Sequence, residues 1–295
     1  MTSAPGKTRP AEATARLRGV RRTVTGMPAS DGAGVRLSRI IGQPGLDMVD
    51  PFLLLDEFKS DRPEDYIAGF PEHPHRGFET VTYMIAGRVR HADNKGHAGV
   101  IEAGGVQWMT AGRGIVHSEM PEQEDGLLWG FQLWVNLPAA DKMKPPAYQE
   151  FPAERIPAES RDGGVVVRVI AGTTAPGTTG PVTGIPTAPA YLDVALAAGS
   201  RFEEPLPAAS SAFVYPFQGK VRVAGNGAAT ELAAGTLGLL GPGDVVRIEA
   251  GDDDARLLLV AGRPLGEPVA RYGPFVMSTK AELTRAYQDF QAGRF

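Results

Sequence analysis

The chain of 295 residues contains no cysteine. Disulfide bonds are therefore impossible, and so are metal sites built from thiolates. The absence of cysteine fits a protein of the reducing cytoplasm, which is the cytoplasmic location that we expect.

Histidine is scarce as well. The histidines all lie between positions 73 and 117, and they are His73, His75, His91, His97 and His117. A transition-metal site in this chain therefore combines imidazole nitrogens from this stretch with carboxylate oxygens. That donor set suits divalent first-row metals.

Long apolar runs are also missing, since no stretch approaches the roughly 18 apolar residues of a membrane span. The formal net charge is −4, so no basic field attracts nucleic acid or an anionic membrane surface. A transcriptional role would therefore act through a protein partner and not by direct contact with DNA. Residues 1–19 begin with a polar, proline-interrupted stretch that lacks the apolar segment of a signal peptide, and we expect a disordered tail there.

Glycine and proline, in contrast, are abundant, with 37 and 25 copies. This composition favours many short strands joined by tight turns. We therefore expect an all-β fold.

The spacing of the histidines indicates a metal site. His73 and His75 are two residues apart, so on an extended strand their side chains point to the same face. His117 and Glu119 share that spacing. On neighbouring strands, three imidazoles and one carboxylate can converge on one ion, and a site with open positions suits iron(II) and oxygen chemistry. The alternative interpretation is two pairs of structural histidines.

The same residues carry a resemblance to a known family. The stretch HPHRGFETVTYMIAGRVRH from His73, and the stretch GGVQWMTAGRGIVHSEMP that ends at Pro121, closely resemble the pirin family of the cupin superfamily. The similarity covers about residues 50–138 and resumes at residues 264–268 and at the carboxyl end. Residues 112–117 read Gly-Arg-Gly-Ile-Val-His, the pirin variant of the common cupin pattern Pro-x-Gly-x-x-His.

The resemblance implies an all-β bicupin, with two β-barrel (double-stranded β-helix) domains and a short carboxyl-terminal helix. It implies one Fe(2+) in the first barrel, or another divalent first-row metal in its place. Carried over position by position, the metal ligands are His73, His75, His117 and Glu119.

For function, the resemblance implies two classes. The first is a quercetin 2,3-dioxygenase-like enzyme, which opens a flavonol ring with O2. Glu119 is our candidate catalytic base, since a ligand carboxylate has a second oxygen that can accept the flavonol hydroxyl proton. The second class is a non-enzymatic regulator whose metal state controls binding to a protein partner.

Glu79 competes with Glu119 as the carboxylate ligand, because the general cupin pattern places a glutamate a few residues after the His-x-His pair. Glu79 is four residues beyond His75, roughly 13 Å along a straight strand at about 3.3 Å per residue. Glu119 is only one pleat from His117, and we prefer it. Glu79 is then expected to be structural or to orient a ligand imidazole.

Several other side chains carry expectations. Residues 127–137 form the most aromatic strand, with Trp129, Phe131 and Leu133 on one face and Leu128, Gln132 and Trp134 on the other. Some of these residues are expected to line an apolar pocket beside the metal. Surface or solvated positions are expected for the cluster Arg18, Arg21 and Arg22 and for Asp56, Glu57, His91 and His97. The alternatives are a place near the metal for Asp56 and Glu57 and a role as metal ligands for His91 and His97.

The domain organisation follows from the turns and from an internal repeat. We expect a metal-binding barrel over residues 20–137, a connection with strand content over 138–190, and a metal-free barrel over 191–263. A rough alignment of the repeat places Pro205, Pro207, Ile248 and Ala250 at the positions of the four predicted ligands. In residues 264–295, Thr279 and Glu282 form a capping box for a short helix.

Overall fold

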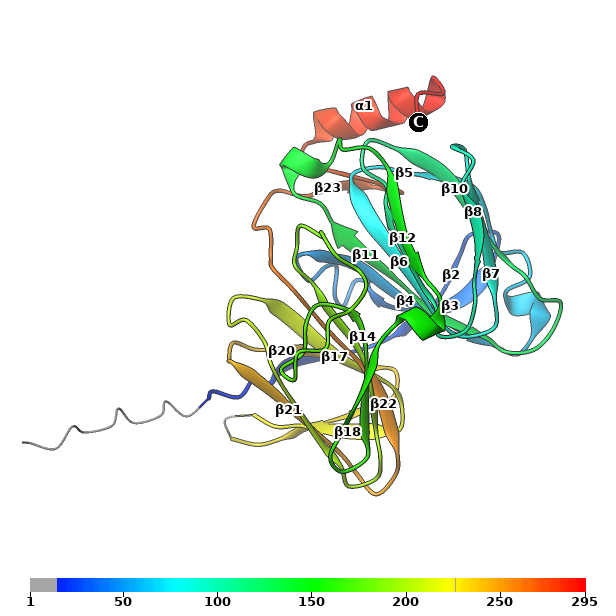
Figure 1. The fold of residues 1–295 in the computed structure, drawn as a ribbon. Helices are drawn as coiled ribbons and strands as arrows, with labels where there is room; N and C mark the ends of the chain where they lie inside the picture. Colours follow the sequence, from blue (N-terminus) through cyan, green and yellow to red (C-terminus); the bar gives the residue numbers. More distant parts are fainter. Residues whose placement is uncertain (1–14, 226) are drawn as a thin grey trace, which may run out of the picture.

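The computed structural model describes residues 15–225 and 227–295, and strands dominate it (Figure 1). The chain forms two barrels, each built from a seven-stranded and a four-stranded antiparallel sheet. The single α-helix in the described residues, α1 (Lys280–Gln291), lies on the first barrel. The expected all-β, two-barrel fold with a carboxyl-terminal helix is therefore confirmed. No helix in the described ranges has the length and apolar character needed to cross a membrane.

The first barrel contains eleven strands. They are β2 (Met27–Asp31), β3 (Val35–Ile41), β4 (Phe52–Ser60), β5 (Phe70–His75), β6 (Phe78–Ala86), β7 (Val89–Asp93), β8 (Ala98–Ile101), β9 (Val106–Thr110), β10 (Ile115–Pro121), β11 (Leu128–Asn136) and β12 (Ala147–Phe151). The large sheet has the order β12-β9-β6-β11-β4-β3-β2, and the small sheet has the order β5-β10-β7-β8.

The second barrel repeats this arrangement. Its strands are β1 (Val20–Thr25), β13 (Ala158–Arg161), β14 (Val165–Ala171), β15 (Ala190–Leu196), β16 (Arg201–Pro205), β17 (Ser211–Gln218), β18 (Lys220–Val223), β19 (Thr230–Ala233), β20 (Thr236–Leu240), β21 (Val245–Ala250) and β22 (Ala255–Gly262). The large sheet runs β1-β20-β17-β22-β15-β14-β13, and the small one runs β16-β21-β18-β19.

The remaining elements are short. They are the hairpin strands β23 (Ala270–Tyr272) and β24 (Phe275–Met277) and the 3-10 helices η1 (Pro63–Asp65), η2 (Ala139–Asp141) and η3 (Ala153–Arg155).

The order of strands in the chain differs from their assignment to barrels. β1 precedes the first barrel in sequence but pairs with β20 of the second, while β12 pairs with β9 of the first. The stretch 138–190, which we described as a connection, supplies β12 to one barrel and β13 and β14 to the other. The assignment of strands to the two barrels therefore differs from the continuous ranges 20–137 and 191–263 that the sequence predicts.

The strands form where the sequence alternates or is continuously apolar. In β14, Val165, Val167 and Val169 are fully buried, whereas Val166 is 38% exposed. This period of two places every second side chain in the core of the second barrel.

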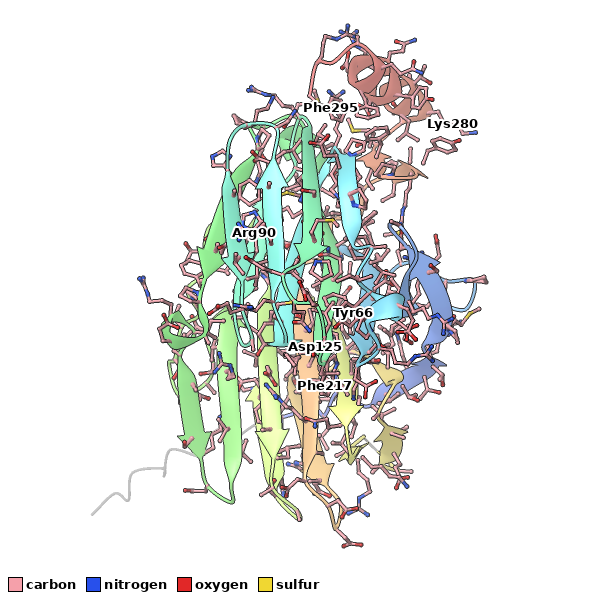
Figure 2. The ribbon with its side chains drawn as sticks, turned by 90° about the vertical axis from the view of Figure 1, so that its right-hand side faces the viewer. Tyr66, Arg90, Asp125, Phe217, Lys280 and Phe295 are labelled. Atoms are coloured by element: carbon pink, nitrogen blue, oxygen red, sulfur yellow. The ribbon has the colours of Figure 1, made fainter. Side chains whose placement is uncertain are left out.

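The barrels meet through an aromatic core. Trp129 and Phe131 of β11 pack against Phe217 of the second barrel, with ring centroids 5.6 and 5.1 Å apart, and Phe217 lies where the barrels join (Figure 2). Polar pairs cross the same interface, since Tyr83 donates to Asp193 at 2.6 Å. Burying these faces against each other excludes water from a continuous core that both barrels share.

The position of the amino-terminal residues in the structure differs from one expectation. Residues 1–14 of the expected disordered tail lie outside the described residues. Arg16 and Arg18 pair with Asp244 and Val245 of the second barrel. The predicted solvated position of Arg18 is wrong, because the residue is 2% exposed and its guanidinium donates to three backbone carbonyls, those of Gly241, Pro207 and Ser210.

Helix α1 begins as predicted. The Thr279 hydroxyl accepts from the Glu282 amide, and the Glu282 carboxylate accepts from the Thr279 amide, which completes the capping box. Asp289 attaches the helix to the first barrel, because its carboxylate accepts from Arg76 at 2.8 Å and from Arg294 and Arg285. These guanidinium groups lower the pKa of Asp289, with the Arg76 hydrogen bond as the largest cause.

We predict that Asp289→Asn lowers the free energy of unfolding at pH 7 by about 2 kcal/mol, because charge-assisted hydrogen bonds are lost. The folded-state pKa lies below the unfolded value of about 3.9, so this stabilisation is present above pH ~4 and is lost as the pH falls below it. Urea unfolding at pH 7 and at pH 3 measures the effect. The difference between wild type and variant should shrink in acid, and a difference independent of pH would contradict the argument. Exposed Asp252→Asn serves as the control.

Candidate metal centre

Antiparallel pairing of β5 with β10 brings the histidines together. His73 lies directly opposite His117, and His75 lies opposite Ile115. Opposite residues share a face of the sheet, so the three imidazoles all point into the first barrel.

The three imidazoles form a compact cluster. Ligating atoms of His73, His75 and His117 all lie within 4.8 Å of one another. Their ring centroids are 4.4 to 5.0 Å apart. In the described residues this is the one group of three or more His, Asp or Glu side chains with such geometry.

Hydrogen bonds orient two of the rings. His73 Nδ1 lies 2.8 Å from the Pro71 carbonyl, and His75 donates to the Pro274 carbonyl. A ring nitrogen that donates in this way leaves the other nitrogen with a free lone pair. Nδ1 of His75 and both ring nitrogens of His117 are buried without a hydrogen-bond partner in the described chain. The cluster therefore fits a metal ion, which would use these lone pairs.

Burial favours the neutral form of His75 and His117. It lowers the pKa of His75 well below the usual value, and repulsion from His117 and His73 adds to the effect. Burial also lowers the pKa of His117 to about 4, although the nearby Glu119 carboxylate opposes the shift. Neutral imidazole is the form that coordinates metals.

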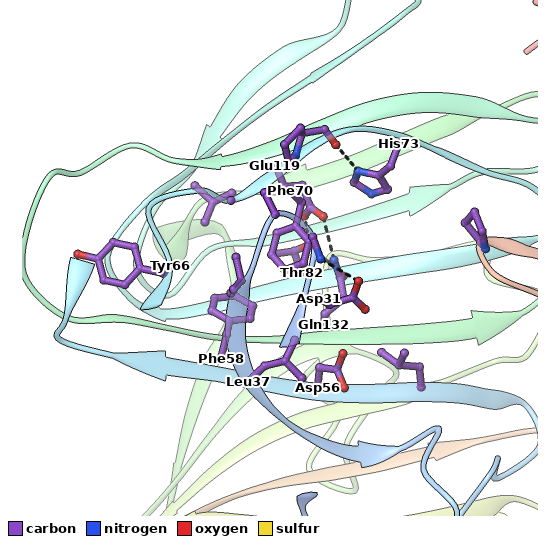
Figure 3. A pocket seen from close by; sticks show the side chains of 18 of the residues that line it. Asp31, Leu37, Asp56, Phe58, Tyr66, Phe70, His73, Thr82, Glu119 and Gln132 are labelled. Atoms are coloured by element: carbon purple, nitrogen blue, oxygen red, sulfur yellow. Dashed lines mark hydrogen bonds between the residues drawn. The ribbon is translucent and has the colours of Figure 1, made fainter. Parts of the chain in front are cut away.

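Glu119 borders this cluster without belonging to the three-histidine group. One carboxylate oxygen accepts from the Thr82 hydroxyl at 2.7 Å, and the other accepts from the Gln132 amide at 3.0 Å. Figure 3 shows these three side chains together below His73. Glu119 lines the same pocket as His73 and His75.

Glu79 lies elsewhere. It is fully buried and accepts from the Thr110 hydroxyl at 2.8 Å, with Lys144 Nζ at 3.7 Å. Burial raises the pKa of Glu79. Glu79 is absent from both the histidine cluster and the pocket lining. Its contacts therefore support Glu119 as the better candidate ligand, and the choice stays a prediction.

A cavity of about 590 Å³ opens beside the histidines. One end of the cavity is lined by His73, His75 and Glu119, while Tyr66 and Phe58 lie at the far end (Figure 3). The other apolar lining residues are Val35, Leu37, Leu54, Phe70, Val89, Leu128 and Trp134. This size and lining are typical of sites for small organic ligands.

Strand β11 supplies both this pocket and the barrel interface. Leu128, Gln132 and Trp134 line the cavity. Trp129, Phe131 and Leu133, on the opposite face, belong to the core between the barrels. The predicted division of the strand into two faces is confirmed.

A row of polar side chains crosses the large sheet of the first barrel. Its members occupy paired positions on neighbouring strands, in the order Arg39, Asp56, Gln132, Thr82, Gln107 and Glu150. The expected surface position of Asp56 is wrong, because this carboxylate is 4% exposed and accepts two hydrogen bonds from Arg39. Glu57 accepts from Trp129 and Tyr215 between the barrels and is not a surface group either.

The remaining histidines differ from each other. His91 was expected in solvent, but it is buried and its Nε2 lies 2.6 Å from a Glu150 carboxylate oxygen. Its partner comes from β12, more than fifty residues along the chain, so the local sequence gave no sign of it. His97 is exposed beside Asp93, as predicted.

The second barrel carries different residues at the equivalent places. Its strands β16 and β21 correspond to β5 and β10, and there Phe202 lies opposite Ile248 and Glu204 lies opposite Val246. If Ile248 is the counterpart of His117, then Phe202 and Glu204 replace His73 and His75, instead of the Pro205 and Pro207 of the sequence alignment. Glu204 is bound by Arg161 at 2.6 Å.

Comparison with known proteins assigns the chain to a family. The family model described as pirin matches residues 34–135, and the model described as the pirin C-terminal cupin domain matches residues 191–295. The chain is 57% identical to a pirin-like protein of Caulobacter vibrioides over 95% of this chain and 99% of that protein. It is 45% identical to pirin of Homo sapiens over 89% of this chain and 88% of that protein.

A solved structure is similar as well. The crystal structure of quercetin 2,3-dioxygenase from Acinetobacter baumannii superposes with a TM-score of 0.86 at 34% identity. The match covers 95% of this chain and 98% of the other. With both family models matched and relatives aligned over nearly the whole sequence, the chain is a bicupin that belongs to the pirin family.

Proposed function

We propose that this protein is a metal-dependent dioxygenase of the quercetin 2,3-dioxygenase type, acting on a flavonol with O2. The observation that carries the proposal is the cluster of three imidazoles, with unpaired buried nitrogens on His75 and His117, at the end of a largely apolar cavity. The similarity to a quercetin 2,3-dioxygenase structure supports it. The cytoplasm stays our expected location.

In this proposal His73, His75, His117 and Glu119 hold one divalent metal, with Fe(2+) as the expected ion. The metal supplies Lewis acidity and open positions for substrate and oxygen. The donor set of nitrogen and carboxylate oxygen suits such an ion, and no thiolate competes for it.

The residues around the metal have separate roles. The apolar lining excludes water and accepts the planar flavonol rings, which favours a fixed orientation of the substrate. Glu119 accepts the proton of the flavonol hydroxyl at one carboxylate oxygen. Thr82 and Gln132, which donate to the two oxygens, fix the position of this carboxylate.

We predict one metal ion per chain. His75→Ala and His117→Ala should each abolish tight binding, because each removes a nitrogen donor from the cluster. Elemental analysis after dialysis measures the content. The exposed His97→Ala is the matched control and should keep the metal. Two ions per chain, or full metal content in both cluster variants, would sink the assignment.

We also predict that Glu119→Gln retains at least part of the metal and lowers quercetin turnover by about 10²–10⁴-fold, the typical worth of general base catalysis. Oxygen uptake and elemental analysis, measured on the same samples, separate the two effects. Glu79→Gln is the control and should keep its metal, since we place Glu79 outside the site.

Two results would decide against this function. A Glu119→Gln variant that holds metal and cleaves quercetin at the wild-type rate would show that Glu119 is not the base. Metal-loaded wild type that neither consumes O2 nor binds flavonols would end the enzyme proposal. The metal-dependent regulator with a protein partner would then be the better explanation.

A further inference from the structure

The cavity of the first barrel is completed by a segment that follows the second barrel in sequence. The hairpin β23–β24 returns to the first barrel beside β5, before helix α1 (Figure 1). Its strand β23 contributes Arg271 to the cavity wall, and its turn contributes Gly273 and Pro274. The carbonyl of Pro274 also holds the His75 imidazole.

Arg271 is fixed at this wall. Its Nη1 donates to the Leu53 carbonyl at 3.0 Å, and its guanidinium carbon lies 4.9 Å from the centre of a Trp134 ring. Trp134 in turn contacts the His75 ring at 5.4 Å. Trp134 thus lies between the Arg271 guanidinium and the histidine cluster. A ligand in the cavity can contact both the guanidinium and the histidines.

The two arginines of the cavity differ in their partners. Arg39 donates to Asp56 and Asp31, so its charge is compensated. Arg271 has no carboxylate oxygen within 4.0 Å in the described residues, and the Leu53 carbonyl uses one of its five N–H groups.

Arg271 is exposed at the cavity wall, so its remaining N–H groups are open to a ligand in the cavity. Partial burial of the side chain and repulsion from Arg39 lower its pKa, although attraction to Asp47, Asp56 and Asp31 opposes the shift. An anionic or strongly accepting oxygen in the cavity would form a charge-assisted hydrogen bond with the guanidinium.

We propose that Arg271 is a specificity-determining residue that binds an acceptor oxygen of the substrate away from the metal-binding oxygen. The inferred ligand class is a planar aromatic compound with a hydroxyl or ionised oxygen at each end. The proposal rests on the proposed function, because it assumes that a flavonol occupies the cavity. A phenolate oxygen suits the guanidinium, and the rings pack along Trp134.

The test compares two ligands that differ at the distal end. Quercetin carries hydroxyl groups on its outer rings, whereas 3-hydroxyflavone keeps the 3-hydroxyl and lacks them. Dissociation constants for both are measured by calorimetry on metal-loaded wild type, Arg271→Met and Arg271→Lys. Arg263→Met, an arginine of the same segment outside the cavity, is the matched control.

We expect Arg271→Met to weaken quercetin binding about ten- to a hundredfold, the worth of a charge-assisted hydrogen bond. The dissociation constant of 3-hydroxyflavone should change much less, so the preference of the protein for quercetin over 3-hydroxyflavone is largely lost in this variant. Arg271→Lys should restore part of it because the charge is kept, and Arg263→Met should match wild type.

Three outcomes of the binding measurements would overturn the inference. Equal losses for both ligands would mean that Arg271 only supports the wall, and no loss would mean that it is a solvated surface arginine. Wild type that binds neither ligand would remove the inferred ligand class. Because binding is measured apart from turnover, Arg271-dependent binding without O2 uptake would refute the dioxygenase and keep this inference. Quercetin binding that is unchanged in Arg271→Met, together with O2 uptake by wild type, would refute this inference and keep the dioxygenase.

Discussion

The candidate site depends on the register between β5 and β10. His117 faces His73 across this pair, and a bulge follows between His117 and Glu119. A shift of one residue would turn the imidazoles of one strand out of the barrel, because side chains alternate between faces. The bulge is equally important, because it shifts Glu119 relative to β5. The Glu119 carboxylate then lies within hydrogen-bond distance of the Thr82 hydroxyl. The small sheet therefore fixes the geometry of the metal centre, and the large sheet supplies the polar groups around it.

Strand β11 links the metal centre to the rest of the molecule. One face holds Gln132 and Trp134 in the cavity, and the other packs Trp129 and Phe131 against the second barrel. The second barrel therefore supports the back of the sheet on which the cavity is built. A close-packed aromatic interface transmits distortion readily, because interiors of native density have few voids to absorb it.

The elements that the sequence predicted well are those with local causes. The Thr279 and Glu282 pair marked the start of α1, and the spacing of His73 and His75 marked a shared face. The errors came from partners distant in sequence. His91, Asp56 and Arg18 are buried because Glu150, Arg39 and Gly241 reach them from other parts of the chain, and no local pattern shows these contacts. The same reason hid Arg271, which reaches the cavity from beyond the second barrel.

The transfer of β1 to the second barrel has a consequence for the order of events during folding. β1 is synthesised early, but its partner β20 lies more than two hundred residues later in the chain. Closing so long a loop is slow compared with forming hairpins, so β1 stays unpaired while the first barrel assembles. Its charged and hydroxylated residues Arg21, Arg22, Thr23 and Thr25 are exposed in the finished structure and discourage pairing with other chains meanwhile. The edge of the second barrel that β1 covers can therefore be completed only after β20 has been synthesised.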